Sequence, residues 1–174
     1  MPARPPILPV DPCGIPDDLK RLPQWVLWTL EPRGDDWTKE PWQLNGRHAS
    51  ATDRSTWTTF DAAIAGHHSG KCDGVGFVLS RDIRIFCVDL DKVRDPATGE
   101  LTDLARQWMA LGTFTELSPS GSGLHLWFSG ELPDDPHRTG SGRRAGGGSP
   151  SNRVEIYASG RFMTVTGQQP EVAR

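Results

Sequence analysis

Short apolar segments bounded by turn residues occur seven times along the chain, a pattern that is typical of β-strands. In chain order they are QWVLWTL, GVGFVLS, RIFCVDLD, TFTELS, LHLWFSG, VEIYAS and RFMTVTG. We expect GVGFVLS and RIFCVDLD to be adjacent strands, separated by a tight turn at the polar pair Arg81 and Asp82. TFTELS and LHLWFSG form a second expected pair, joined by the glycine-serine turn PSGSG.

Two stretches have apolar residues at helical spacing. Ser55 is a suitable N-cap for the first helix. Its apolar face would consist of Trp57, Phe60, Ala63 and Ile64. The segment ELTDLARQWMALG predicts a second, amphipathic helix that ends at Gly112. Its expected inward residues are Leu101, Leu104, Ala105, Trp108 and Leu111. Because strands outnumber helices and the helices fall between strand pairs, the predicted fold class is α+β, built on an antiparallel or mixed sheet.

The length of 174 residues corresponds to one domain. Residues 1–16 contain six prolines, which predict an N-terminal arm without a long helix or an inner strand. Residues 17–174 are expected to form a single domain. The stretch 31–53 is polar and turn-rich, with Asn45 and Gly46 as a hairpin turn. Because only a short tail follows the last strand, we expect the chain to be one piece of a longer protein.

Composition narrows the function classes. The formal net charge of -3 and the pI of about 5.9 argue against a generally basic protein that coats nucleic acid. The three cysteines, Cys13, Cys72 and Cys87, form no CxxC pair and suggest neither a disulfide framework nor a cysteine zinc site. No apolar run approaches the length of a membrane span, so a cytoplasmic location without a membrane partner is expected.

Two aspartates stand at the end of the apolar segment IRIFCVDLD. Asp89 and Asp91 are two residues apart in a predicted strand, so they point to the same face. Neighbouring carboxylates repel each other unless a proton or a cation lies between them, and a divalent cation satisfies this need. The alternative is that both aspartates simply end the strand and begin a turn.

Two further polar residues interrupt later apolar strands. His125 lies within LHLWF and follows the turn SPSGSG, whose backbone N–H groups and hydroxyls could surround phosphate oxygens. The hydroxyls belong to Ser118, Ser120 and Ser122. Glu155 lies between Val154 and Ile156 in the strand VEIYAS. Three carboxylates can hold two divalent ions, an arrangement that serves in-line phosphoryl or nucleotidyl transfer.

The segments VDLD, ELSPSGSGLHLWF and VEIYASGRFMTVTG resemble, in order and spacing, three motifs of the archaeo-eukaryotic primase superfamily. The resemblance is specifically to the bifunctional primase/polymerase (prim-pol) domains of phage and plasmid replication proteins, and it covers most of the chain between Trp42 and Gly167. It implies a palm similar to the RNA-recognition motif, with flanking helices. It also implies two Mg²⁺ or Mn²⁺ ions, nucleoside triphosphates as substrates, and a single-stranded DNA template with its primer.

The resemblance assigns roles to individual residues. Asp89 and Asp91 correspond to the metal-binding acids of the first motif, and Glu155 to the acid of the third. His125 corresponds to the histidine that contacts the incoming triphosphate. Many members have serine two residues before this histidine, where this chain has Gly123, so either Ser120 or Ser122 could contact phosphate. The zinc element of some relatives has no counterpart here, and no zinc is expected.

Basic residues near the third motif are candidates for binding polyanions. Arg143 and Arg144 lie in a Gly/Ser-rich stretch that is either a clamp on nucleotide or template, or a solvated loop. Arg161 directly follows the Glu155 strand and is the stronger candidate for a phosphate contact. Lys39 is a weaker one, and Trp37 and Trp42 beside it could stack on a base or pack internally.

The leading hypothesis is a template-directed nucleotidyltransferase, acting as a DNA primase, a DNA polymerase or both, in the replication of a phage, plasmid or other mobile element. Its catalytic residues would be Asp89, Asp91, His125 and Glu155. A helicase domain or subunit is a possible partner. The alternatives are a metal-dependent nuclease that uses the same carboxylates and a catalytically silent nucleic-acid-binding replication module.

Overall fold

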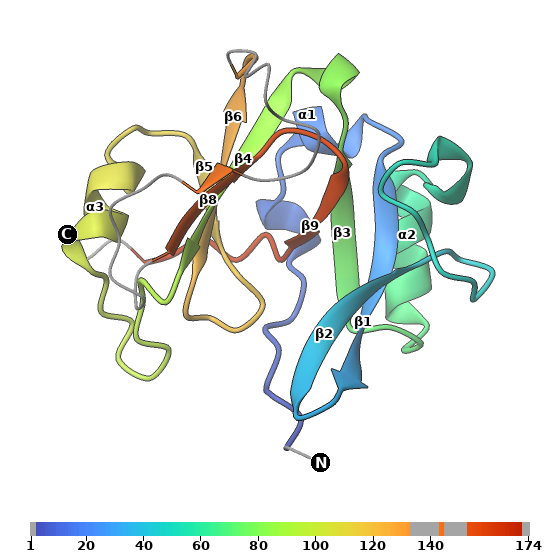
Figure 1. Cartoon of the computed structure of the whole chain (residues 1–174), viewed down its shortest axis with the longest axis horizontal. Helices are drawn as coiled ribbons and strands as arrows, with labels where there is room; N and C mark the ends of the chain where they lie inside the picture. Colours follow the sequence, from blue (N-terminus) through green and yellow to red (C-terminus); the bar gives the residue numbers. More distant parts are fainter. Residues whose placement is uncertain (1–2, 133–142, 145–152, 172–174) are drawn as a thin grey trace.

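Two antiparallel sheets dominate the computed structural model, which describes residues 3–132, 143–144 and 153–171. The four-stranded sheet has the order β2-β1-β3-β9, and the five-stranded sheet has the order β5-β6-β4-β8-β7. Every strand pair within them is antiparallel. Together with the helices this confirms the predicted α+β class. Figure 1 shows α3 beside the five-stranded sheet and α2 beside β1 and β3.

The four-stranded sheet contains a strand that the sequence analysis missed. Its members are β1 (Trp25–Arg33), β2 (Asp36–Trp42), β3 (Gly74–Leu79) and β9 (Arg161–Val165). β2 lies in the polar stretch that was expected to hold only turns, and it pairs along its whole length with β1. The pair turns at Gly34, whose φ of 64° favours glycine. Polarity misled the prediction because β2 is an edge strand, which needs fewer apolar residues.

The five-stranded sheet has the connectivity of a split β-α-β unit. Its members are β4 (Ile85–Asp91), β5 (Phe114–Leu117), β6 (Leu124–Ser129), β7 (Arg143–Arg144) and β8 (Arg153–Tyr157). The helix α3 (Asp103–Met109) follows β4, and β6 then returns between β5 and β4. The predicted pairing across the turn PSGSG is confirmed, since β5 and β6 form a hairpin. This strand order matches the expected palm.

The expected neighbours GVGFVLS and RIFCVDLD lie in different sheets, which corrects the prediction of a hairpin. β3 pairs with β1 and β9, whereas β4 pairs with β6 and β8. A 3-10 helix, η3 (Arg81–Ile83), separates them, and Arg84 after it is left-handed with φ of 51°. The chain therefore leaves the first sheet here instead of turning back along it.

Helix boundaries differ in detail from the predictions. Ser55 lies within a 3-10 helix, η2 (Arg54–Thr56), and the N-cap of α2 (Phe60–His68) is Thr59, whose hydroxyl accepts a hydrogen bond from the Ala62 amide. Trp57 consequently lies before α2. Leu111 was expected to face inward but is 61% exposed, because α3 has already ended at Met109.

Two apolar clusters stabilise the domain. One joins the two sheets, with Phe77 of β3 against Trp127 of β6 at 5.6 Å between ring centroids. The other packs α3 beneath the five-stranded sheet, mainly through Val88, Leu90 and Leu126. Since Val88 and Leu90 face this second cluster, Asp89 and Asp91 must face the opposite side, toward the first sheet.

The N-terminal arm contacts both sheets. The Leu8 amide donates to the Pro119 carbonyl beside β5, and the Asp11 amide donates to the Thr166 carbonyl after β9. The arm also contains the 3-10 helix η1 (Pro12–Gly14) and leads into the one-turn helix α1 (Asp17–Lys20). In Figure 1 the arm passes between the two halves of the molecule.

Candidate functional site

Four titratable residues form a row across the five-stranded sheet. Strand register places Glu116 of β5 opposite His125 of β6, His125 opposite Asp89 of β4, and Asp89 opposite Glu155 of β8. Residues that lie directly opposite each other in an antiparallel pair have side chains on the same face. Three of the four predicted catalytic residues therefore lie side by side on adjacent strands.

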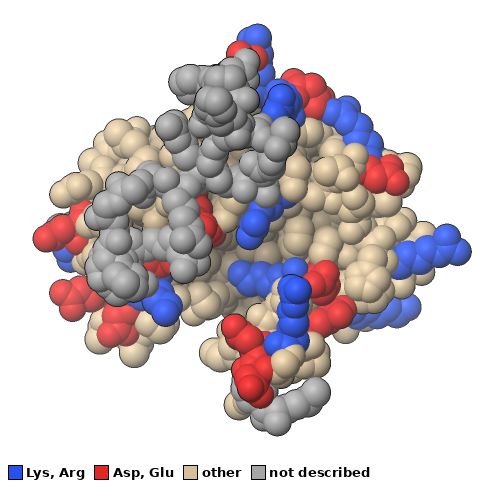
Figure 2. All heavy atoms as spheres, viewed as in Figure 1, with Lys and Arg blue, Asp and Glu red and all other residues tan. Residues whose placement is uncertain are grey.

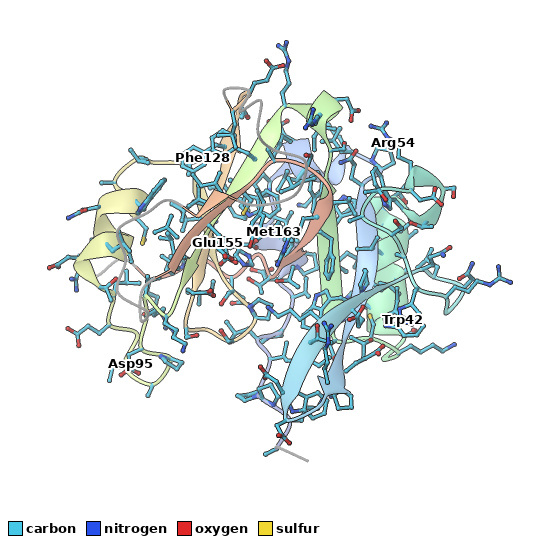
Figure 3. The ribbon with its side chains drawn as sticks, in the orientation of Figure 1. Trp42, Arg54, Asp95, Phe128, Glu155 and Met163 are labelled. Carbon is cyan, nitrogen blue, oxygen red and sulfur yellow. The ribbon has the colours of Figure 1, made fainter. Side chains whose placement is uncertain are left out.

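Asp91 completes the predicted acidic group. It lies two residues beyond Asp89 on β4, on the same face, and both side chains are partly exposed. Figure 3 shows Glu155 near the middle of the molecule, whereas Asp95 and Arg54 lie toward its periphery. The prediction that Asp89 and Asp91 share a face is confirmed by their positions in β4, and the register places Glu155 on that face too. The catalytic and metal-binding roles of these acids stay predictions.

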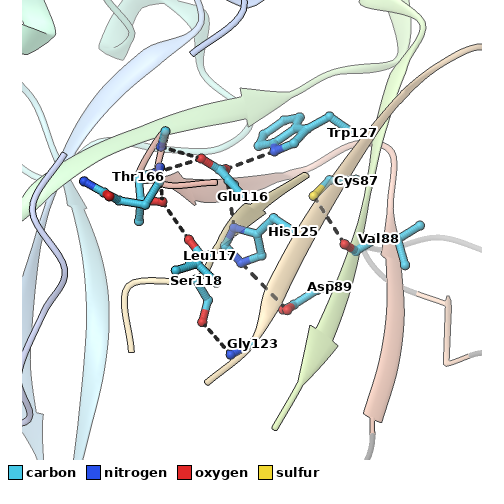
Figure 4. Close-up of polar contacts among 12 residues, drawn as sticks. Cys87, Val88, Asp89, Glu116, Leu117, Ser118, Gly123, His125, Trp127 and Thr166 are labelled. Atoms are coloured by element: carbon cyan, nitrogen blue, oxygen red, sulfur yellow. Dashed lines mark hydrogen bonds and ion pairs between the residues drawn. The ribbon is translucent and has the colours of Figure 1, made fainter. Parts of the chain in front are cut away.

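His125 lies between two carboxylates and is almost fully buried (Figure 4). Its Nε2 is 3.7 Å from Asp89 Oδ1, and its Nδ1 is 3.6 Å from Glu116 Oε1. Burial lowers the pKa of His125, but Glu116 and Asp89 more than offset this, so the pKa is raised above its ordinary value. The imidazole is thus suited to donate hydrogen bonds to an anion.

Burial raises the pKa of Asp89, because removing water disfavours its charged form. His125 and Lys39 act against this shift, while the like charges of Asp91 and Glu155 reinforce it. A partly buried carboxylate that remains costly to ionise despite two nearby cationic groups would gain from a further cation. This environment supports the sequence-based hypothesis of metal binding at Asp89.

Glu155 is held by the aromatic residue that follows it on the same face of β8. The Tyr157 hydroxyl donates a hydrogen bond to Glu155 Oε2. Burial and this bond raise the pKa of Tyr157, which therefore stays protonated. The guanidinium of Arg161 lies 4.5 Å from the Tyr157 ring centroid, in cation-π contact. Arg161 is exposed at the start of β9, so its charge is accessible, and the predicted phosphate contact of Arg161 stays a prediction.

The three serines of the turn between β5 and β6 play different structural parts. Ser118 is buried, and its hydroxyl accepts a hydrogen bond from the Gly123 amide. Ser120 is exposed and Ser122 is partly buried, and their hydroxyls lie 2.8 Å apart. Ser120 and Ser122 are therefore better placed than Ser118 to contact a ligand, while Ser118 shapes the turn.

The glycine that replaces the usual serine of the second motif has a steric explanation. A Cβ atom at Gly123 would lie 2.7 Å from the Leu90 carbonyl oxygen and 3.0 Å from Ser118 Oγ. The close approach of this turn to β4 thus requires glycine at Gly123 in this chain.

Lys39 lies near the acids, although the sequence analysis treated it as a weaker candidate for a phosphate contact. It lies on β2 of the other sheet, and its ammonium interacts electrostatically with Asp89, Asp91 and Arg161. The side chain has exposed surface, yet the protein around it removes enough water to lower its pKa; Asp89 and Asp91 oppose this shift, and Arg161 adds to it. Figure 2 shows a hollow in the middle of this face, bordered by Lys and Arg atoms.

The remaining sequence candidates are only partly placed. The backbones of Arg143 and Arg144 form β7 and pair with β8, with Arg144 opposite Glu155, but their side chains lie outside the described residues. Trp42 stacks on His48 at 4.1 Å and donates to Glu31, so one face of its ring is already occupied. Among the residues described, no helix is long and apolar enough to cross a membrane.

Glu116 is the residue of the row that sequence reasoning missed. A usable signal was present, because the predicted hairpin around PSGSG places Glu116 opposite His125 once the two strands are aligned. Glu116 was overlooked because a single acid in TFTELS, near a strand end, is unremarkable without that alignment.

The donor atoms fit the expected cations. Asp89, Asp91 and Glu155 offer carboxylate oxygens, which are the ligands that Mg²⁺ and Mn²⁺ prefer. Over the described ranges, no group of three or more His, Cys, Asp and Glu side chains is drawn together into a ready-made metal site. The three acids share a face of adjacent strands, and binding of ions would require their side chains to converge.

An antiparallel palm that aligns aspartates, a histidine and a glutamate on adjacent strands is the arrangement that the resemblance to prim-pol domains implies. Comparison with known proteins agrees: the chain is 40% identical, over 153 residues or 86% of its length, to a curated DNA primase-polymerase of Nitratiruptor phage NrS-1. This match confirms the resemblance to the prim-pol domains. The chain spans 20% of the length of that relative. No protein-family model matches the chain.

Proposed function

We propose that this chain is the catalytic domain of a template-directed nucleotidyltransferase, acting as a DNA primase, a DNA polymerase or both, in the replication of a phage, plasmid or other mobile element. The observation that carries the proposal is the register of His125, Asp89 and Glu155 on three adjacent strands. The similarity to a phage DNA primase-polymerase supports the same activity.

In this proposal Asp89, Asp91 and Glu155 hold two Mg²⁺ or Mn²⁺ ions. Such ions, when bound, lower the pKa of the attacking 3′-hydroxyl and neutralise charge on the triphosphate and the departing pyrophosphate. The partial burial of Asp89 strengthens its attraction to cations, because less water screens it. The Tyr157 hydrogen bond orients Glu155 on the same face.

The remaining residues bind and orient the nucleotide and the DNA. His125 would donate a hydrogen bond from its imidazole to a triphosphate oxygen, with Ser120 and Ser122 adding hydroxyl donors from the adjacent turn. Arg161 and Lys39 would neutralise phosphate charge from the opposite sheet. Arg143 and Arg144 are proposed to contact the triphosphate or the single-stranded template. The pairing of a serine-glycine turn with His125 favours a triphosphate substrate over the nuclease alternative.

A primer-extension assay and a de novo synthesis assay test this function. Both are run with dNTPs or NTPs and with Mg²⁺ or Mn²⁺, on the wild type, Asp89→Ala and the control Asp61→Asn, whose carboxylate is exposed on α2. We expect incorporation by the wild type and the control and none by Asp89→Ala. DNA degradation without incorporation would establish the nuclease instead. Equal incorporation by wild type and Asp89→Ala would refute the proposed metal site.

A further inference from the structure

Glu116 is a fully buried carboxylate that has no place in the proposed catalytic roles. Its side chain is 0% exposed. An isolated buried carboxylate is destabilising by several kcal/mol, and such groups persist only when donors surround them. The identity of its donors therefore indicates what this residue does.

Three N–H groups donate to Glu116 from two different parts of the fold (Figure 4). Trp127 Nε1 donates to Oε1 at 3.0 Å. The backbone amides of Thr166 and Gly167 donate to Oε2 at 2.9 Å and 2.7 Å. Trp127 belongs to β6 of the five-stranded sheet, whereas Thr166 and Gly167 directly follow β9 of the other sheet. Glu116 thus joins the two sheets through a single carboxylate.

The same carboxylate faces the histidine of the site. Glu116 Oε1 is 3.6 Å from His125 Nδ1, and this nitrogen has no hydrogen-bond partner among the described residues. The opposite ring nitrogen, Nε2, is 3.7 Å from Asp89 Oδ1. The imidazole therefore has one nitrogen directed at a buried anchor and the other directed at the acids.

We propose that Glu116 is the positioning residue for His125. It accepts a hydrogen bond from Nδ1–H once the two groups close by a few tenths of an ångström, and it thereby directs Nε2 toward the acids and the nucleotide. Its second oxygen, Oε2, holds the residues that directly follow β9, so that β9, which begins at Arg161, keeps a constant position relative to His125. A carboxylate or carbonyl acceptor behind a functional histidine sets the tautomer and orientation of the ring in many sites.

The variant Glu116→Gln separates the two requirements with little change in volume. An amide has only one oxygen, whereas Glu116 accepts hydrogen bonds on both sides. The amide oxygen will face the backbone amides of Thr166 and Gly167, because both donate at short distance to Oε2, whereas Oε1 receives one short bond, from Trp127 Nε1. Its NH₂ group then faces Trp127 Nε1 and His125 Nδ1, so neither nitrogen can donate to it. His125 loses the carboxylate acceptor for Nδ1–H, while the bonds from Thr166 and Gly167 that join the sheets are retained.

Steady-state kinetics tests the inference. This test, like the nucleotide-binding role of His125, rests on the proposed function. We expect Glu116→Gln to raise KM for the incoming nucleotide by about 10- to 100-fold, the range known for the loss of a partner behind a metal-binding histidine, with a smaller change in kcat. The control is Glu100→Gln, an exposed glutamate that should leave KM unchanged.

A double-mutant cycle separates positioning from general stabilisation. If Glu116 acts through His125, then Glu116→Gln has no further effect on KM in a His125→Ala background. An equal rise in KM in both backgrounds would overturn the inference. If Glu116→Gln does not fold, as judged by circular dichroism, Glu116→Asp takes its place, since it keeps the acceptor but moves it away from the ring.

Nitrogen-detected NMR of the histidine rings gives a test that does not need activity. The wild type should show a proton on His125 Nδ1, assigned by comparison with His125→Ala, and Glu116→Gln should shift or abolish that signal while Glu100→Gln leaves it unchanged. An unprotonated Nδ1 in the wild type, or an unchanged signal in Glu116→Gln, refutes the inference. If the wild type polymerises nothing, the proposed function fails, and the NMR result still decides the role of Glu116.

Discussion

The two sheets contribute opposite charges to the candidate site. The five-stranded sheet supplies Asp89, Asp91 and Glu155 together with His125, whereas the four-stranded sheet supplies Lys39 and Arg161. We call Asp89, Asp91 and Glu155 the acidic wall, and Lys39 and Arg161 the basic wall. The acids suit divalent cations and the basic residues suit phosphates. In the proposed function, a nucleotide that arrives with its cations would therefore match the charges of both sheets.

The largest expected effect comes from the acidic wall. Asp91→Asn and Glu155→Gln should each lower kcat by more than about 100-fold, because even the partners behind metal ligands contribute 10- to 100-fold. Primer extension measures this, with Asp61→Asn as the matched control of the same chemical change. Activity within a few-fold of wild type in either variant would show that the substituted acid takes no part in catalysis.

The basic wall should affect binding more than rate. Lys39→Ala and Arg161→Ala are each expected to raise nucleotide KM by about tenfold, since a hydrogen bond to a charged group contributes roughly 1.5–3 kcal/mol. The rise should shrink at high salt, which screens exposed charges. Lys71→Ala, an exposed lysine outside the site, is the control. A fall in kcat with unchanged KM would show that these cations act on the reaction step instead.

A smaller effect is expected at the turn that joins β5 to β6. Gly123→Ser restores the serine found in many prim-pol domains, but its Cβ would lie 2.7 Å from the Leu90 carbonyl oxygen. We expect a loss of about 1–3 kcal/mol in the free energy of unfolding, as for other overpacked sites. Denaturant unfolding measures it, with Ser122→Ala as the comparison. An unchanged midpoint would show that β4 and the turn can separate at no cost.

The acidic wall could be predicted from the sequence, whereas the position of Lys39 in the basic wall could not. The acids and His125 interrupt apolar strands, so alternation alone marks Asp89, Asp91, His125 and Glu155 as unusual. The hairpin around PSGSG was predictable because its strands are neighbours in sequence. Lys39, by contrast, lies on an exposed edge strand whose polar sequence resembles a loop. Its approach to Asp89 depends on the packing of two sheets, which local pattern does not encode.

The separation of β3 from β4 was missed for a related reason. Both segments have strand character, and the short polar link between them resembles a hairpin turn. The choice between pairing with each other and joining different sheets depends on distant partners, namely β1 and β9 for β3, and β6 and β8 for β4. The register that aligns Asp89 with His125 and Glu155 follows from that choice, so the row itself could not be derived from spacing.

The smallest expected effect concerns how much the ionised Asp89 of the acidic wall lowers the free energy of unfolding. The pKa of Asp89 is raised above its ordinary value of 3.8 in the folded chain, so the folded state favours the protonated form. Its contribution to stability is present below pH 3.8 and is lost as the pH rises through the raised pKa. Asp89→Asn cannot ionise and should therefore be more stable than wild type at about pH 7.5, by about 0.5–2 kcal/mol, with a smaller gain at about pH 4.5. Thermal unfolding in EDTA measures both values.

Adding Mn²⁺ should raise the Tm of the wild type more than that of Asp89→Asn, because only the wild type retains all three acids. A variant less stable than wild type at the higher pH in EDTA would show that His125 and Lys39 already compensate Asp89, and that the acidic wall needs no further cation.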